Sequence, residues 1–286
     1  MKNKALYLSL SSLSLATICQ AQWAPLVSDN FDEYTFGDQA TTNTQGITWQ
    51  NSNGATKITS NQLVTDETGG TNSSGAVLPA NVAGTGNALY YFDNDGGVAR
   101  NGINFSATDD TYDVARVDFD FSFVDVDAGN SAGFGNVSIN NPNNTATGSS
   151  TNRAVTVNLH YNGRVSWAGG GIDLTNPNGS HSMSIVANGG DSSYSYSALD
   201  GSGTVTLASK SFDVYIDGDL LGTSVGFDTD LPLGRFGFTS FSTPTGAEFM
   251  IDNLETFAAV PEPAESAAYA AVVALIFCVF LRRRSS

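Results

Sequence analysis

The chain has 286 residues, 41% of them hydrophobic, and its 12 basic and 28 acidic side chains give a formal net charge of −16. This length is ample for burying a sizeable core. The acidity excludes nucleic acid as a partner, because too few basic side chains are present to replace the counterions of a phosphate backbone. Divalent cations and neutral polymers remain as partners.

Residues 1–21 have the pattern of a secretory signal peptide. Two lysines precede an apolar stretch at residues 5–18, and Cys19 and Ala21 occupy the two small-residue positions before a cleavage point after Ala21. The alternative is a lipoprotein leader with the lipid on Cys19, although Ile18 stands where such leaders have a small residue. In either case we expect the body to be exported.

Residues 22–263 are the body of the chain, and we expect one β-sandwich domain over residues 22–258. The body has 7 basic and 27 acidic side chains, a net charge of −20, and both cysteines, Cys19 and Cys278, lie outside it. It therefore cannot use disulfides, thiolate zinc sites or a cysteine nucleophile.

Alternation of apolar and polar residues predicts strands throughout the body. Residues 115–123 place Val117, Phe119, Phe121 and Phe123 on one face, which is the period of a half-buried strand. Further strands are predicted at residues 235–240 and 248–257, the latter with Phe249, Ile251 and Phe257 on one side, and weaker ones at 47–50, 62–65, 89–92, 137–139, 181–187, 194–199 and 204–207.

Two hairpins are predicted from their turn residues. Residues 155–161 pair with 164–167 across Asn162-Gly163, and residues 211–216 pair with 220–221 across Asp217-Gly218. No stretch of the body has a 3.6-residue period. The sequence therefore predicts an all-β fold, an antiparallel β-sandwich of jelly-roll type.

Three segments near the end of the body resemble the last strands of concanavalin A-like or laminin G-like sandwiches. They are FDVYIDGDLLG at 212–222, RFGFTSFS at 235–242 and FMIDNLETF at 249–257. The resemblance implies that the closing strand pairs with the first one, at residues 29–34 (DNFDEY). It does not define an activity, since lectins, enzymes and passive spacers share such folds.

Catalytic signals are weak in the body. The five glutamates at 33, 67, 248, 255 and 262 form no alternating carboxylate run of the kind glycosidases need, and Glu248 and Glu255 are predicted on opposite faces of one strand. A Ser-His-Asp arrangement would have to use His160 or His181, and neither neighbours a recognisable nucleophile motif. The sequence predicts that the protein is not an enzyme.

Calcium is the metal that the sequence favours. Carboxylates cluster with Gly and Asn at residues 93–96, 109–113 and 125–130, and oxygen ligands on turns suit calcium. Asp93 and Asp95 are the preferred candidate ligands. The alternative is that Asp and Asn serve the turns themselves.

Carbohydrate binding would need flat aromatic faces beside hydrogen-bonding groups. The candidates are Trp49, Trp167, Tyr194 and Tyr196, with Trp167 next to a glycine-rich loop and the two tyrosines on one face. The alternative is that these rings pack in the sandwich or cover its edge.

Residues 259–286 combine three features. A non-helical stop is made by Pro261, Glu262 and Pro263, an uncharged apolar run follows at 267–281, and a basic cluster is made by Arg282, Arg283 and Arg284. This order resembles the PEP-CTERM sorting signal of Gram-negative bacteria, which exosortase reads. The alternative is a plain C-terminal membrane anchor, since the run spans about 22 Å of a roughly 30 Å hydrocarbon core.

These patterns favour an exported, non-enzymatic surface or extracellular-matrix protein, anchored in the inner membrane by a transmembrane helix at 267–281 until exosortase processes it. The alternative is a carbohydrate-binding laminin G-like module, with or without calcium, that acts on extracellular polysaccharide. A glycoside hydrolase is the third hypothesis.

Overall fold

The computed structural model describes residues 22–32, 42–51, 62–65, 87–93, 100–123, 126–142, 151, 153–240 and 247–260. The predicted signal peptide, the Pro-Glu-Pro motif, the transmembrane helix and the arginine cluster lie outside these residues. Among the described residues, no helix is both long enough and apolar enough to cross a membrane.

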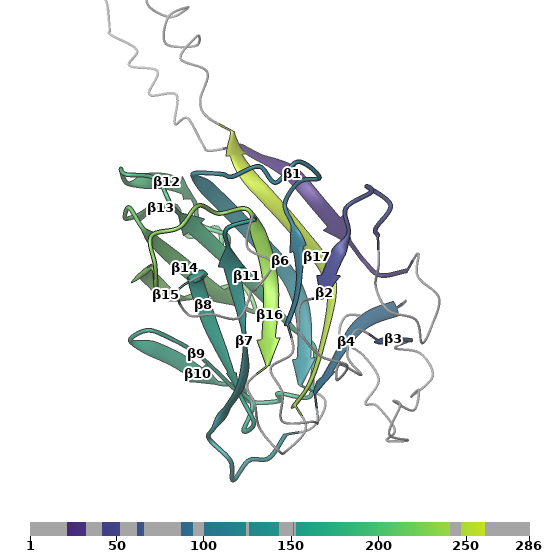
Figure 1. Cartoon of the computed structure of the whole chain (residues 1–286). Helices are drawn as coiled ribbons and strands as arrows, with labels where there is room; N and C mark the ends of the chain where they lie inside the picture. Colours follow the sequence, from purple (N-terminus) through teal and green to yellow (C-terminus); the bar gives the residue numbers. More distant parts are fainter. Residues whose placement is uncertain are drawn as a thin grey trace, which may run out of the picture. The chain divides into compact units, whose positions relative to one another are not determined.

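Most of the described strands form two antiparallel sheets (Figure 1). The eight-stranded sheet has the order β15 (Asp219–Gly226), β14 (Ser211–Ile216), β11 (His181–Asn188), β6 (Val114–Phe123), β17 (Ala247–Val260), β4 (Asn87–Asp93) and β3 (Gln62–Thr65), with β1 (Gln22–Asp29) paired to β17. The seven-stranded sheet has the order β10 (Gly170–Asp173), β9 (Arg164–Trp167), β8 (Arg153–His160), β7 (Gly133–Asn140), β16 (Arg235–Ser240), β5 (Arg100–Asn104) and β2 (Trp49–Asn51). The prediction of an all-β, antiparallel fold is confirmed, and the two large sheets enclose the core as in a β-sandwich.

The core lies between the two sheets and is built by alternation along each strand. Phe119 and Phe121 of β6 and Phe236 and Phe238 of β16 are all buried in it, and the ring centroids of Phe119 and Phe236 are 5.2 Å apart. Burying a phenylalanine side chain stabilises a fold by roughly 1.5–3 kcal/mol. A core of this aromatic content can thus stabilise the fold without disulfides.

The two predicted hairpins both form, with different loops. Between β14 and β15, Asp217 and Gly218 both have positive φ, 52° and 86°, as predicted for a two-residue turn. Between β8 and β9 the loop has three residues: Asn158 pairs with Ser166, and Gly163, at φ 79°, donates its N–H to the His160 carbonyl. The predicted two-residue turn is therefore wrong here, and the register shifts by one.

The closing strand β17 pairs with the first strand, as the resemblance implied. The first strand is β1, however, rather than residues 29–34. It ends at Asp29 because the Asp29 carboxylate accepts a hydrogen bond of 3.0 Å from the N–H of Phe31, which turns the chain at a φ of 59°.

A bulge in β17 corrects another prediction. The register with β6 shifts by one between Asp252 and Glu255, so every side chain after the bulge changes face. Phe257 is therefore not on the core side with Phe249. It lies opposite Arg116, whose guanidinium is 4.8 Å from the centre of the Phe257 ring.

A short hairpin, β12 (Tyr194–Ser197) and β13 (Thr204–Leu207), forms a second small core with the eight-stranded sheet. Tyr196, Leu207, Val186 and Tyr215 are its buried members, and Trp23 packs against them. Burial also raises the pKa of Asp213, whose carboxylate accepts a hydrogen bond of 2.7 Å from the Tyr196 hydroxyl.

Candidate functional site

The two predicted tryptophans are buried. Trp49 is 3% exposed, and its indole N–H donates to the Asp29 carboxylate at 2.7 Å. Trp167 is 8% exposed and lies between two glycines: a Cβ atom on Gly170 would be 2.6 Å from the Trp167 Nε1, and one on Gly222 would be 2.8 Å from it. The ring thus packs between the two edge strands β10 and β15.

The tyrosines share a face, as predicted, with ring centroids 6.5 Å apart. Tyr196 is 1% exposed, its hydroxyl is bonded to both Asp213 and Tyr215, and burial together with these two partners raises its pKa. Tyr194 is half-buried against Trp23. Trp49, Trp167 and Tyr196 therefore do not form an exposed aromatic platform, and their rings pack in the fold, which was the alternative for these candidates.

Calcium ligation by Asp93 and Asp95 stays a prediction. Asp93 is the last residue of β4, and Asp95 lies outside the described residues. In the described part of the chain, no group of three or more His, Cys, Asp or Glu side chains is placed to hold a metal ion. The Asp127 carboxylate and the Asn130 amide oxygen instead accept backbone N–H groups two residues on, as turn residues do.

The face of the seven-stranded sheet that points away from the core is polar across five strands; its side chains on β5, β7 and β16 are buried, and those at residues 156–166 of β8 and β9 are partly exposed. Register places Ser166, Asn158, Asn136 and Thr239 in one row on β9, β8, β7 and β16. We call this surface the polar face; its side chains are Asn104, Asn136, Ser138, Asn140, Arg153, Thr156, Asn158, His160, Arg164, Ser166, Arg235 and Thr239. Amide, hydroxyl and guanidinium groups there offer both donors and acceptors.

Hydrogen-bonding capacity in the polar face is left unmet. Asn136 is 1% exposed, and neither atom of its side-chain amide has a partner. The Oδ1 atom of Asn104 and the Oγ1 atom of Thr156 are also buried without one. A buried polar group left unsatisfied costs about 1–3 kcal/mol, so these groups lower the stability of the fold.

Arg235 places a buried positive charge in the middle of the polar face. It lies on β16 between Asn104 and Asn140 and is fully buried. Burial lowers the pKa of the guanidinium to about 10, and the carboxylate of Asp109 offsets part of that effect. The side chain is thus still charged at neutral pH.

Charge is divided unequally between the two sheets. The strands of the eight-stranded sheet carry nine carboxylates and one arginine: Asp29, Asp93, Asp118, Asp120, Asp213, Asp219, Glu248, Asp252, Glu255 and Arg116. The strands of the seven-stranded sheet carry one carboxylate and four arginines: Asp173, Arg100, Arg153, Arg164 and Arg235. In a body of net charge −20, this concentrates most of the basic side chains on one sheet.

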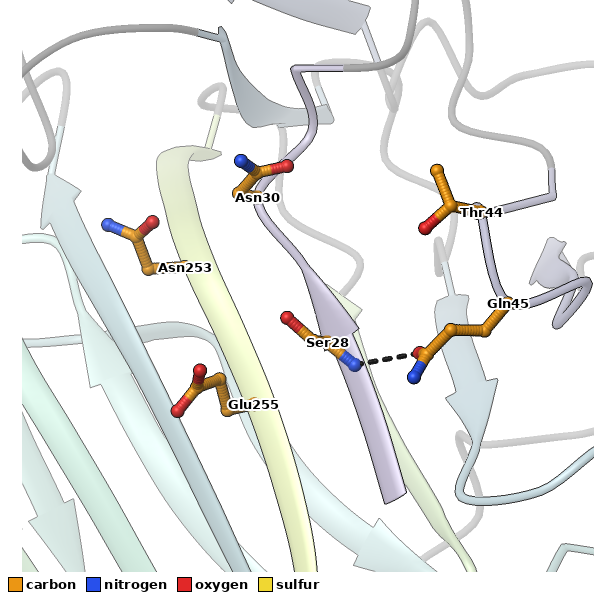
Figure 2. Close-up of a pocket in the computed structure, with 6 residues that line it drawn as sticks. All are labelled: Ser28, Asn30, Thr44, Gln45, Asn253 and Glu255. Atoms are coloured by element: carbon orange, nitrogen blue, oxygen red, sulfur yellow. Dashed lines mark hydrogen bonds between the residues drawn. The ribbon is translucent and has the colours of Figure 1, made fainter. Parts of the chain in front are cut away.

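A separate pocket of about 410 Å³ lies beside β1 and β17 (Figure 2). Asn253 and Glu255 line it from β17, Thr44 and Gln45 from the turn at residues 42–48, and Ser28 and Asn30 from β1 and its end. All six side chains are exposed, and the Gln45 Oε1 accepts a hydrogen bond of 2.9 Å from the Ser28 N–H. Because all six side chains are exposed, none of them has a buried polar atom without a partner, so the polar face is the better candidate.

The sequence reasoning missed the polar face. Polar residues at alternate strand positions are ordinary on a solvent-facing surface, so Asn136 and Ser138 drew no notice. The available signal was the position of the arginines, because Arg153, Arg164 and Arg235 all lie on predicted strands or next to them. To see that these arginines share one face, one must also know which strands belong to the same sheet.

No known protein-family model and no curated protein sequence matches this chain. Several solved structures resemble it. The carbohydrate esterase vb_24B_21 from the Shiga toxin-encoding bacteriophage phi24B is 14% identical, with a TM-score of 0.43 over 84% of this chain and 100% of that one. The binding domain of botulinum neurotoxin DC, solved with rat synaptotagmin II, is 10% identical, with a TM-score of 0.42 over 84% of this chain and 49% of that one, and peanut lectin is 12% identical, with a TM-score of 0.39 over 82% and 99%. Identities and TM-scores this low concern the β-sandwich fold alone.

Proposed function

We propose that this protein binds an acidic, carboxylate-bearing polysaccharide across the polar face. The observation that carries the proposal is the division of charge, four arginines against one carboxylate on the strands of the seven-stranded sheet. The net charge alone favoured a neutral polymer. The local charge of the polar face favours an anionic one, because a ligand responds to the potential where it docks.

The chemistry of the polar face suits both parts of such a ligand. Arginine guanidinium groups bind carboxylates with two parallel hydrogen bonds. The side-chain amide of Asn158 can donate to and accept from sugar hydroxyls. Asn158 on β8 and Arg164 on β9 are partly exposed, so a polymer reaches them from solvent.

The test compares two arginines in affinity electrophoresis of the purified protein through gels that contain polymannuronate. Arg164 lies on the polar face and pairs with Asp173; Arg116 lies on the eight-stranded sheet and pairs with Asp118. We expect Arg164→Gln to weaken retention about 10- to 150-fold, as loss of a charged hydrogen bond of roughly 1.5–3 kcal/mol implies. Arg116→Gln should leave retention unchanged.

Dextran gels provide the neutral control, and the wild-type protein should pass through them unretarded. Equal retention on polymannuronate and dextran would show that charge is not recognised. Equal loss in both arginine variants would place binding outside the polar face. Either result would refute the proposal.

We further propose that the protein reaches the cell surface through a PEP-CTERM sorting signal handled by exosortase. The support is the order of Pro261-Glu262-Pro263, the apolar run at 267–281 and the arginines at 282–284. The last strand, β17, ends at Val260, directly before the motif. A cut there would leave the described strands intact.

We expect Glu262→Ala to block processing without lowering the melting temperature of the protein. The substitution changes the motif alone, which lies outside the described strands. Immunoblots of membrane and surface fractions would show the unprocessed form accumulating in the membrane. Normal maturation of the variant would contradict the sorting proposal.

A further inference from the structure

His160 has the bonding of a general base. It ends β8, and its Nδ1 lies 2.9 Å from the carbonyl oxygen of Ser131. A carbonyl oxygen only accepts, so Nδ1 carries the proton of the neutral ring. The lone pair of Nε2 then faces the hydroxyl oxygen of Ser166, which is 2.7 Å away. This distance is within the range for a nucleophile and its base.

The three-residue loop between β8 and β9 creates this pair. With Asn158 opposite Ser166, the side chains of residues 158, 160, 164 and 166 all point to the polar face. His160 and Ser166 are then diagonal neighbours, which a long side chain can bridge. The two-residue turn expected from the sequence would have put them on opposite faces of the hairpin.

The other histidine is bonded differently. His181 Nδ1 lies 2.8 Å from the Asp217 carboxylate, and its Nε2 lies 2.8 Å from the carbonyl oxygen of Asn176. Both ring nitrogens therefore face acceptors, and neither can take a proton from a hydroxyl. His181 ties two loops together, and it is a natural control for His160.

The surroundings of Ser166 suit an acyl group. Asn158 is directly opposite on β8, and a side-chain amide at that range can donate to a developing oxyanion. On the other side Ser166 faces Gly171 of β10, where a Cβ atom would lie 2.8 Å from that of Ser166 and 3.0 Å from the Arg164 Nη2. The absence of a side chain at Gly171 thus leaves room for the guanidinium beside Ser166. Arg164, on the same face of β9, brings a positive charge.

We propose that Ser166 and His160 form a nucleophile–base pair that hydrolyses O-acyl esters on the polysaccharide bound at the polar face. The ester specificity rests on the proposed function, because the acidic polysaccharide brings the ester to Ser166. The proposal departs from the prediction that the protein is not an enzyme. That prediction considered the neighbours of His160 along the chain, whereas Ser166 is its neighbour across the hairpin.

The reaction balances with water as its co-reactant. The Ser166 oxygen attacks the acyl carbon while Nε2 of His160 takes the hydroxyl proton. The bond from the acyl carbon to the sugar oxygen breaks, and the sugar oxygen takes the proton back from His160. Water then attacks the acyl-serine with His160 again as base, which releases the carboxylic acid and restores Ser166.

The test measures acetate released by the purified full-length protein from partly O-acetylated polymannuronate. We expect Ser166→Ala and His160→Gln each to lower the rate at least about 100-fold, the range of general-base contributions. His181→Gln should keep the wild-type rate. A fluorophosphonate should add its mass to Ser166 in the wild-type protein and leave the Ser166→Ala variant unlabelled.

Retention of each variant on deacetylated polymannuronate separates this inference from the proposed function. Ser166→Ala should be retained as well as the wild type while releasing no acetate, which would support both. Retention of the wild type without acetate release, or release that survives both variants, would overturn the esterase and leave binding intact. Failure of the wild type to be retained would overturn the binding proposal itself.

Discussion

At the scale of single residues, two buried asparagines show what a partnered and an unpartnered amide do in this fold. Asn188 is 1% exposed; its Nδ2 donates to the carbonyls of Ser192 and Ala208, and its Oδ1 accepts from the Gly190 N–H. Asn136 is equally buried, and neither atom of its side-chain amide has a hydrogen-bond partner. The first amide holds a turn, whereas the second leaves its hydrogen-bonding capacity unmet.

We predict that Asn136→Leu raises the stability of the ligand-free protein by about 1–3 kcal/mol, because it removes an unsatisfied buried group. Urea unfolding monitored by tryptophan fluorescence measures this effect.

Asn188→Leu is the matched control and should destabilise the protein by about 1–3 kcal/mol, because it leaves backbone groups without partners. Destabilisation of similar size in both variants would mean that Asn136 is satisfied in solution. Its assignment as an unsatisfied buried amide would then be wrong.

Burial at this scale was only partly predictable. The apolar alternation of residues 115–123 placed Phe119 and Phe121 correctly in the core. The sequence pattern could not distinguish an aromatic ring that stacks on a sugar from one that fills a gap in the core, because both kinds of ring are large and partly apolar. Trp167 can be buried because Gly170 and Gly222 have no side chains and leave room for its ring. The two glycines come from two strands that are distant in sequence.

At the scale of elements, the strands were largely predictable and their exact registers were not. The turn at Asp217-Gly218 was correct because both residues adopt positive φ. At Asn162-Gly163 only the glycine does so, and the loop gains a residue. The bulge in β17 has the same effect on Phe257. A one-residue shift in register moves every later side chain of the strand to the other face of the sheet. The position of a strand is therefore easier to predict than the face on which each of its side chains lies.

Two described strands were missed for a related reason. β5 has the sequence RNGIN and β10 has GGID; neither shows alternation, and each has a single β-branched residue, an isoleucine. Neighbouring strands specify them: β5 pairs with both β16 and β2, and β10 pairs with β9. Such tertiary pairing overrides weak local propensity.

At the scale of the whole molecule, the sequence predicted the fold class, but the distribution of charge required the topology. Arg153, Arg164 and Arg235 are far apart along the chain and come together only because β8, β9 and β16 belong to one sheet. The carboxylates of β6, β14 and β17 are gathered on the other sheet by the same topology. The net charge of −20 on the body therefore conceals a sandwich with one basic and one acidic sheet.

This polarity predicts that polyuronate affinity passes through a maximum as salt is raised. At about 0.01 M salt the screening length is roughly 30 Å, so the polymer is repelled by the whole acidic body. At about 0.1 M it is roughly 10 Å, and distant carboxylates are screened while contacts with the arginines persist. At about 1 M it falls to roughly 3 Å, and these contacts weaken as well. Retention of the wild type on polymannuronate, measured across this range, should be strongest near 0.1 M. A steady fall from the lowest salt would mean that the acidic sheet is not felt by the ligand, and no dependence on salt would mean that the arginines do not bind it.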